Sequence, residues 1–147
     1  MSLRGTIRSN HMPVNNFRLV VVGLPPLTPV SIGELESELE TVMLPDRTVV
    51  SGGNTKPGET DIAIPAHHDI EIFAMELWLR GSKDPVNPAY KLPATVLLNR
   101  LAGGIPRTFS LPGLFPKKRV TPALEMDNEG DMAVIVYTLS YDDVVLL

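Results

Sequence analysis

Cysteine is absent from this 147-residue chain. The sequence therefore excludes disulfides, thiolate zinc sites and a cysteine nucleophile. Histidine is also scarce, with three residues, and no Gly-x-Ser-x-Gly elbow accompanies them. These absences argue against a catalytic triad.

Long hydrophobic runs are absent as well. None reaches the roughly 18 residues of a membrane span, and the start of the sequence lacks the apolar region of a signal peptide. The formal net charge of −4 is unfavourable for a protein that grips nucleic-acid phosphates. The sequence thus predicts a soluble protein, made in a cytoplasm, that does not bind membranes.

Proline, in contrast, is abundant. The chain contains 14 prolines, about twice the usual share of roughly 5%. Because proline interrupts helices and central strands, we expect short strands joined by stiff loops. We predict an N-terminal arm over residues 1–16 and a single mainly β domain over residues 17–147.

The stretch Asp69–Arg80 predicts a helix, with Asp69 as its N-cap. It is apolar on nearly all sides, and a helix of this kind is buried on more than one face. The first apolar face consists of Ile70, Phe73, Ala74 and Leu77. The other side carries Ile72, Met75, Trp78 and Leu79.

Several other stretches predict strands, because they are rich in β-branched residues or alternate between polar and apolar. They are Phe17–Val22, Thr60–Ile64, Thr95–Leu101, Arg107–Leu111, Arg119–Met126 and Asp131–Tyr141. Pro112, Gly113 and Pro116 are expected to separate the fourth strand from the fifth. Asp131–Tyr141 is apolar on both faces, which predicts a central strand with covering layers on both sides.

The stretch Ser31–Leu44 is compatible with two structures. As a helix it has an apolar stripe and a possible capping box at Ser31 and Glu34. As a strand its glutamates would all lie on one face, opposite leucine and threonine. The following Ser51–Glu59, with two adjacent glycines, predicts a long flexible turn.

Residues of chemically active types occur without the spacing of a site. His67-His68-Asp69 lacks further metal ligands, and Gly52-Gly53 lacks the context of a nucleotide loop. Asp142-Asp143 fits solvated carboxylates, and Lys117–Arg119 fits a charged loop or an inter-subunit ion pair. We predict no enzyme activity, no metal and no cofactor.

Several short motifs occur in an order and spacing that resembles the tail tube protein of contractile-tailed bacteriophages. The resemblance covers roughly Phe17 to Leu147. Its motifs are Gly33–Glu36 entering Glu40–Pro45, Ser51–Gly53, Asp69–Trp78, Leu114–Lys117, Gly130–Ala133 and Asp142–Leu147.

The resemblance implies a small β-sandwich or barrel with one packed helix and a long protruding β-hairpin. Copies would form hexameric rings that stack into a tube for DNA ejection in a virion tail. The partners would be a sheath, a baseplate, a tail terminator and DNA as passing cargo. Tubes of type VI secretion and other contractile injection systems are related alternatives, and a small-ligand-binding β-barrel is an alternative of another class.

The resemblance also gives roles to particular residues. Gly33–Leu44 would begin the hairpin and Thr60–Ile64 would return it, with residues 1–16 and Ser51–Glu59 as candidates for ring-to-ring contact. Four glutamates would face the lumen and repel DNA phosphates: Glu34, Glu36, Glu38 and Glu40. On the helix, Ile70, Phe73 and Leu77 would cover the subunit's own sheet. The subunit interface would then contain Ile72, Met75 and Leu79.

Overall fold

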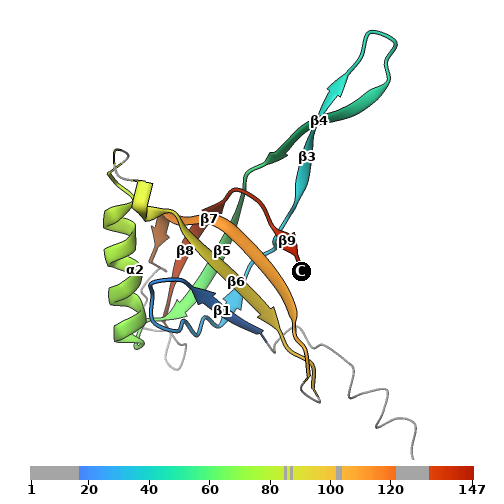
Figure 1. Ribbon diagram of the computed structural model, residues 1–147. Helices are drawn as coiled ribbons and strands as arrows, with labels where there is room; N and C mark the ends of the chain where they lie inside the picture. Colours follow the sequence, from blue (N-terminus) through green and yellow to red (C-terminus); the bar gives the residue numbers. More distant parts are fainter. Residues whose placement is uncertain (1–16, 85, 87, 102–103, 122–132) are drawn as a thin grey trace, which may run out of the picture.

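Antiparallel strands dominate the computed structural model, which describes residues 17–84, 86, 88–101, 104–121 and 133–147. The strands are β1 Phe17–Val21, β2 Ser31–Ile32, β3 Glu38–Met43, β4 Val49–Lys56, β5 Gly58–Pro65, β6 Leu92–Leu98, β7 Arg107–Val120, β8 Val134–Tyr141 and β9 Val145–Leu146. The helices are α2 Asp69–Gly81 and the 3-10 turn η1 Pro88–Tyr90. The predicted mainly β fold with one packed helix and a protruding hairpin is confirmed (Figure 1).

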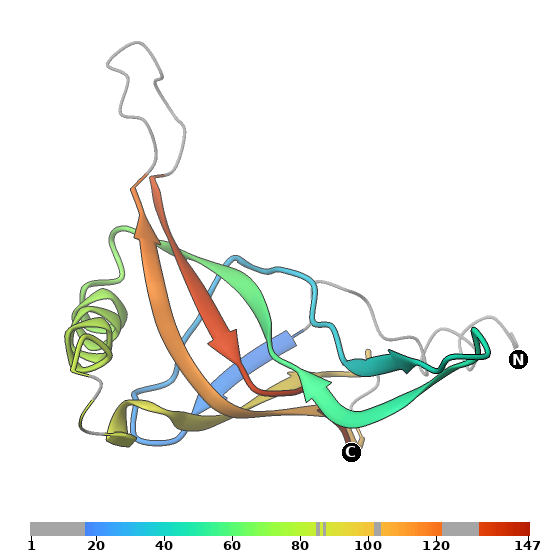
Figure 2. The same ribbon diagram turned by 90° about the horizontal axis from the view of Figure 1, so that it is seen from above.

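Strand β7 organises the seven-stranded sheet, whose order is β1-β6-β7-β8-β5-β2 with β9 also on β7. Its first part, up to Leu114, pairs with β6, and from Phe115 onward it pairs with β8. The sheet therefore curls around a core, as Figure 2 shows from above. Pro112, Gly113 and Pro116 lie inside this 14-residue strand. The predicted break was wrong, since a register shift after Pro116 accommodates the proline, as bulges commonly do.

The core is built from the inward residues of the body strands. Its largest fully buried side chains include those of two tyrosines. The members lie on β1, β5, β6, β7, β8 and α2, apart from Leu27, which belongs to the loop after β1. They are Leu19, Val21, Leu27, Ile62, Ile64, Met75, Trp78, Ala94, Val96, Leu111, Leu114, Tyr137, Leu139 and Tyr141.

Strand β8 lies centrally between β7 and β5, as predicted. Tyr137, Leu139 and Tyr141 are buried on one face, whereas Val136 and Thr138 on the other face are half-buried. Within the described part of one chain, only one face of β8 is fully covered, whereas the prediction expected a covering layer on both faces. Asp131 and Met132, which the prediction included in this strand, lie outside the described residues.

Helix α2 packs across β7, but the two faces are exchanged relative to the prediction. Met75 is 0% exposed and belongs to the core, so its expected place at a subunit interface was wrong. Ile72 and Leu79 are half-buried. The solvent side carries Ile70, Phe73 and Leu77, with exposed fractions of 75%, 64% and 49%.

An ionic network holds the helix on the sheet. The Glu76 carboxylate accepts hydrogen bonds from Arg119 at 2.6 Å and from the Tyr137 hydroxyl at 3.0 Å. Partial burial opposes ionisation of Glu76, but these two bonds and the charges of Arg119 and Arg80 outweigh it and lower its pKa. Burial, then the bond to Glu76, raises the pKa of Tyr137.

The assignment of the buried and exposed faces of α2 can be tested on the dilute protein. Met75→Ala should lower the free energy of unfolding by about 2–5 kcal/mol, because it removes core contacts and leaves a cavity. Phe73→Ala, the matched control on the exposed face, should change it by less than about 0.5 kcal/mol. Urea unfolding monitored by circular dichroism measures both, and equal losses would contradict this assignment of the faces.

The lowered pKa of Glu76 predicts a pH effect. The contribution of this group is present above the usual glutamate pKa of about 4.3 and is lost as the pH falls through the lower folded value. Glu76→Gln should therefore be less stable than wild type at neutral pH, and the difference should shrink in acid. Urea midpoints from about pH 7 to 3 measure this convergence. A difference that does not change with pH would contradict it.

Candidate assembly surfaces

The hairpin β3–β4 forms a separate two-stranded sheet that projects from the body on the side away from α2 (Figures 1 and 2). Every residue of β3 is exposed, and so is nearly all of β4. The exposed apolar side chains of the hairpin are Leu39, Val42, Met43, Leu44, Val49 and Val50. Because an isolated two-stranded hairpin is marginally stable and its open edges invite pairing, this element needs a partner.

The hairpin's limits differ from the prediction. Ser31–Leu44 contains no helix. It contains the strands β2 and β3, so the strand alternative was correct for these two parts and wrong for residues 33–37 between them. The returning strand is β4, whereas β5, which contains Thr60–Ile64, lies in the body and pairs with β8. Most of Ser51–Glu59 is therefore strand and not a flexible turn. Two glycines misled the prediction because Gly52 and Gly53 lie in a bulge. A Cβ added to Gly52 would make a tight contact with the Glu40 carbonyl oxygen, at 3.0 Å.

The four predicted lumen residues do not form one continuous row on a strand. All are exposed, but Glu34 and Glu36 precede β3, and only Glu38 and Glu40 belong to it. Glu38 forms an ion pair with Lys56 across the hairpin at 3.3 Å.

The pairing register separates two faces of the hairpin. One face holds all three charged residues of the two strands, Glu38, Glu40 and Lys56, together with Val42 and Val50. The opposite face is uncharged and consists of Leu39, Thr41, Met43, Val49, Ser51 and Thr55.

Tyr141 anchors the root of the hairpin. Its hydroxyl accepts the Glu36 N–H at 2.9 Å and donates to the Glu36 carbonyl at 3.2 Å. Its ring lies against Gly58, where an added Cβ would approach the hydroxyl to 2.6 Å. Beside it, the Ser37 hydroxyl donates to Asp143 at 2.8 Å. The C-terminal end of β8 thus fixes the segment that leads into β3.

The tip of the hairpin is a tight turn. The Arg47 N–H donates to the Leu44 carbonyl at 2.9 Å, and the Leu44 N–H donates to the Thr48 carbonyl at 2.8 Å. Hydrogen bonds from Thr48 lower the pKa of Asp46. Arg47 has a φ of 68°, the left-handed conformation that glycine usually occupies in such turns. An L-residue there costs roughly 1 kcal/mol.

A second surface is the outer side of α2, where Ile70, Phe73 and Leu77 form an apolar stripe. The helix begins after His68, which makes no side-chain cap, so the predicted capping by Asp69 was wrong. Instead Glu71 accepts the Thr28 N–H at 3.1 Å and its hydroxyl at 2.7 Å, which ties the start of the helix to the proline loop.

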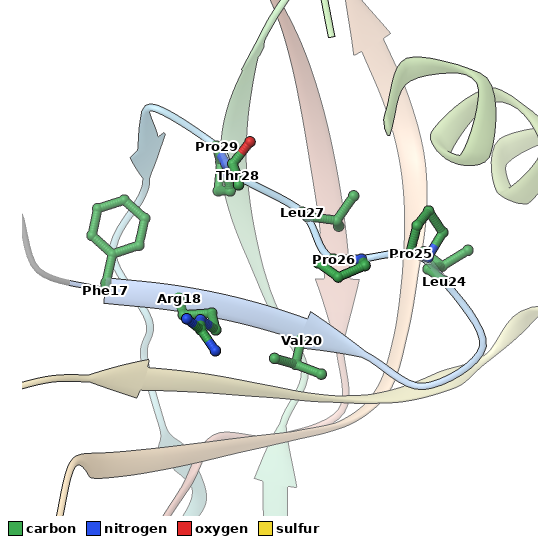
Figure 3. Close-up of a pocket in the computed structure, with 9 residues that line it drawn as sticks. All are labelled: Phe17, Arg18, Val20, Leu24, Pro25, Pro26, Leu27, Thr28 and Pro29. Carbon is green, nitrogen blue, oxygen red and sulfur yellow. The ribbon is translucent and has the colours of Figure 1, made fainter. Parts of the chain in front are cut away.

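The proline-rich loop Leu24–Pro29 forms a groove of about 550 Å³ with the edge strand β1 (Figure 3). Phe17, Arg18 and Val20 line one side, and residues of the loop Leu24–Pro29 line the other. The hydroxyl of Thr28 is already bonded to Glu71. In the part of the chain that the structure describes, Arg18 is the one charged residue that lines the groove. A ligand pocket brings several polar groups together, so this groove does not favour the small-ligand alternative.

Two of the three residues of the basic cluster Lys117–Arg119 are paired within the chain. Lys117 contacts Glu59, and Arg119 contacts Glu76, both from strand β7 and not from a loop. Among the described residues, no group of three or more histidines and carboxylates has the geometry of a metal site. No helix in the described ranges is long and apolar enough to cross a membrane.

Comparison with solved structures finds proteins of the same fold. A chain of the sheath-tube complex of an extracellular contractile injection system (PVC, extended state) has a TM-score of 0.74 and 19% identity, covering 100% of this chain and 98% of that one. The anti-feeding prophage cap, named as a tube terminating cap, gives 0.74 and 17%, covering 93% and 91%. Hcp1 from Flavobacterium johnsoniae gives 0.56 and 11%, covering 88% and 93%.

No protein-family model and no curated protein matches the sequence. The structural likeness nevertheless extends over nearly the whole of this chain and of its neighbours. The chain therefore has the fold of contractile-injection-system proteins, in agreement with the resemblance in its motifs.

The anchoring role of Tyr141 is testable. Tyr141→Phe keeps the buried ring but removes both hydrogen bonds to Glu36, and should lower the free energy of unfolding by about 1 kcal/mol. Amide exchange should quicken at Glu36 and along β3. Tyr90→Phe is the matched control, because the bond that Tyr90 makes to Trp78 uses its backbone carbonyl. Unchanged exchange at Glu36 in Tyr141→Phe would contradict the anchoring role.

Proposed function

We propose that this protein is a structural subunit of the tube of a contractile tail or injection system. The observation that carries the proposal is the isolated hairpin β3–β4, which exposes both its edges and its apolar side chains. An element of this kind is stable only when another chain covers it. The shared fold with the chains of PVC, the anti-feeding prophage and Hcp1 supports the same assignment.

The positions of the two exposed surfaces support ring closure. The hairpin and the apolar stripe on α2 lie on opposite sides of the body (Figure 1). Because the two surfaces differ, contact between them is heterologous, and such contacts generate closed rings or filaments. We place Ile70, Phe73 and Leu77 at this interface, together with the half-buried Ile72 and Leu79.

The two faces of the hairpin suggest their environments in the ring. The uncharged face would gain most from burial, so it packs on a neighbouring copy. The face with Glu38 and Glu40 then remains in water and lines the lumen. In this arrangement Glu34 and Glu36 lie at the root of the hairpin. Repeated carboxylates on a channel wall repel phosphates and reduce adsorption of nucleic acid.

The partners and the cargo of the tube distinguish a phage tail from an injection system. The motifs favour a phage tail with hexameric rings and DNA as cargo, while the solved neighbours come from extracellular contractile injection systems and Hcp1. A sheath and a terminating cap, named for the neighbours, are the expected partners, with a baseplate at the other end. Nucleic acid inside purified native particles would favour the phage tail, and its absence would favour an injection system.

Assembly of the purified chain tests the proposal. Wild type should form rings or tubes of constant diameter by electron microscopy, and a monodisperse monomer at high concentration would overturn the proposal. Phe73→Asp should remain folded, since Phe73 is exposed, but should abolish assembly by placing a carboxylate in an apolar interface. Val86→Asp introduces the same carboxylate at an exposed apolar residue beyond the helix and should assemble normally.

A further inference from the structure

A small acidic pocket lies at the root of the hairpin, where the chain after β2 separates from β5. Its volume is about 370 Å³. Two short segments form the wall, and four of the six residues are carboxylates: Gly33, Glu34, Glu36, Glu59, Thr60 and Asp61.

Thr60 gives independent reason to expect a ligand here. Its side chain is 5% exposed, and its Oγ1 has no hydrogen-bond partner among the described residues. Buried polar atoms nearly always have a hydrogen-bond partner. A ligand in the pocket would supply the partner that the Thr60 hydroxyl lacks. A Cβ on Gly33 would lie 3.1 Å from Thr60 Oγ1, so the glycine keeps the space beside the hydroxyl open.

The carboxylates differ in what they already bind. Asp61 accepts the Thr138 hydroxyl at 2.7 Å, and Glu59 is paired with Lys117. Within the described ranges the carboxylates of Glu34 and Glu36 have no partner, although Tyr141 holds the Glu36 backbone in place. Two free carboxylates next to an unbonded hydroxyl suit a cation that carries several hydrogen-bond donors.

The geometry favours a side chain over a metal ion. The described carboxylates are not clustered as metal ligands. A guanidinium presents five N–H donors in a plane, which suits dispersed oxygen acceptors better than a compact metal ion does.

Arg47 has the properties of that cation. It lies at the exposed tip of the hairpin, and it is the one non-glycine residue with positive φ in the described chain. Glycine would relieve the turn, so the arginine side chain occupies this position at a conformational cost. The six residues of β3, about 20 Å at 3.3 Å per residue, separate the tip from the root of its own hairpin.

We propose that the Arg47 guanidinium of one copy binds in the acidic pocket of a second copy. It donates to the carboxylates of Glu34 and Glu36 and to Thr60 Oγ1. This contact rests on the proposed tube function and gives each hairpin a defined end point on another subunit.

Paired cysteines test the contact directly, because the chain contains no cysteine of its own. Arg47→Cys combined with Glu36→Cys should give a reducible ladder of linked copies on oxidation. Arg47→Cys combined with Lys83→Cys is the matched control and should give none. Assemblies without a 47–36 link would overturn this contact while leaving the tube function intact. A wild-type chain that folds but does not assemble would overturn both the contact and the tube function.

Charge variants distinguish a contact of Arg47 with a second copy from a role of Arg47 in the geometry of its own turn. Arg47→Gly and Arg47→Glu should each raise the concentration needed for assembly about tenfold or more, whereas Arg47→Lys should raise it less. Glycine relaxes the turn, so a purely structural Arg47 predicts improved assembly in Arg47→Gly. Arg47→Glu combined with Glu34→Lys and Glu36→Lys should recover much of the loss. Lys83→Glu controls for net charge, and failure of the combined variant to recover would count against the pocket.

Discussion

The position of the hairpin depends on one contact, the Tyr141 side chain between Gly58 and the Glu36 backbone. Tyr141 ends β8, the central strand, so the most buried part of the sheet determines where the most exposed element begins. A side chain at position 58 would displace the ring and release the segment before β3. The position of this exposed surface is in this sense determined by the core.

Parts of the fold were predictable from sequence because they depend on local pattern. The central strand is an apolar run on both of its faces, the helix has apolar residues at helical spacing, and both elements are present. The side of the helix that faces the core was not predictable, since both of its sides are apolar. The orientation of the helix depends on residues distant in sequence. Glu76 binds Arg119 and Tyr137, and in this orientation Met75 faces the core.

The hairpin shows a second limit of local reasoning. Gly52 and Gly53 are typical of a turn, but their neighbours on β3 pair around them as a bulge. Pro112 and Pro116 likewise lie within β7, at the place where the strand exchanges one partner for another. Cross-strand geometry, absent from any sequence window, decides both cases. The acidic pocket was equally inaccessible, because it joins residues near position 34 to residues near position 60.

Strands β4 and β5 are separated by Pro57 alone, so the hairpin and the body share a nearly continuous length of backbone. Tension applied to a hairpin held by a neighbour would act along this backbone on β5, whose pairs with β8 would bear it in shear and all at once. Pairs loaded in shear share the force, whereas pairs that are peeled open break one after another. The protein is therefore built to resist pulling along the hairpin more strongly than bending across it.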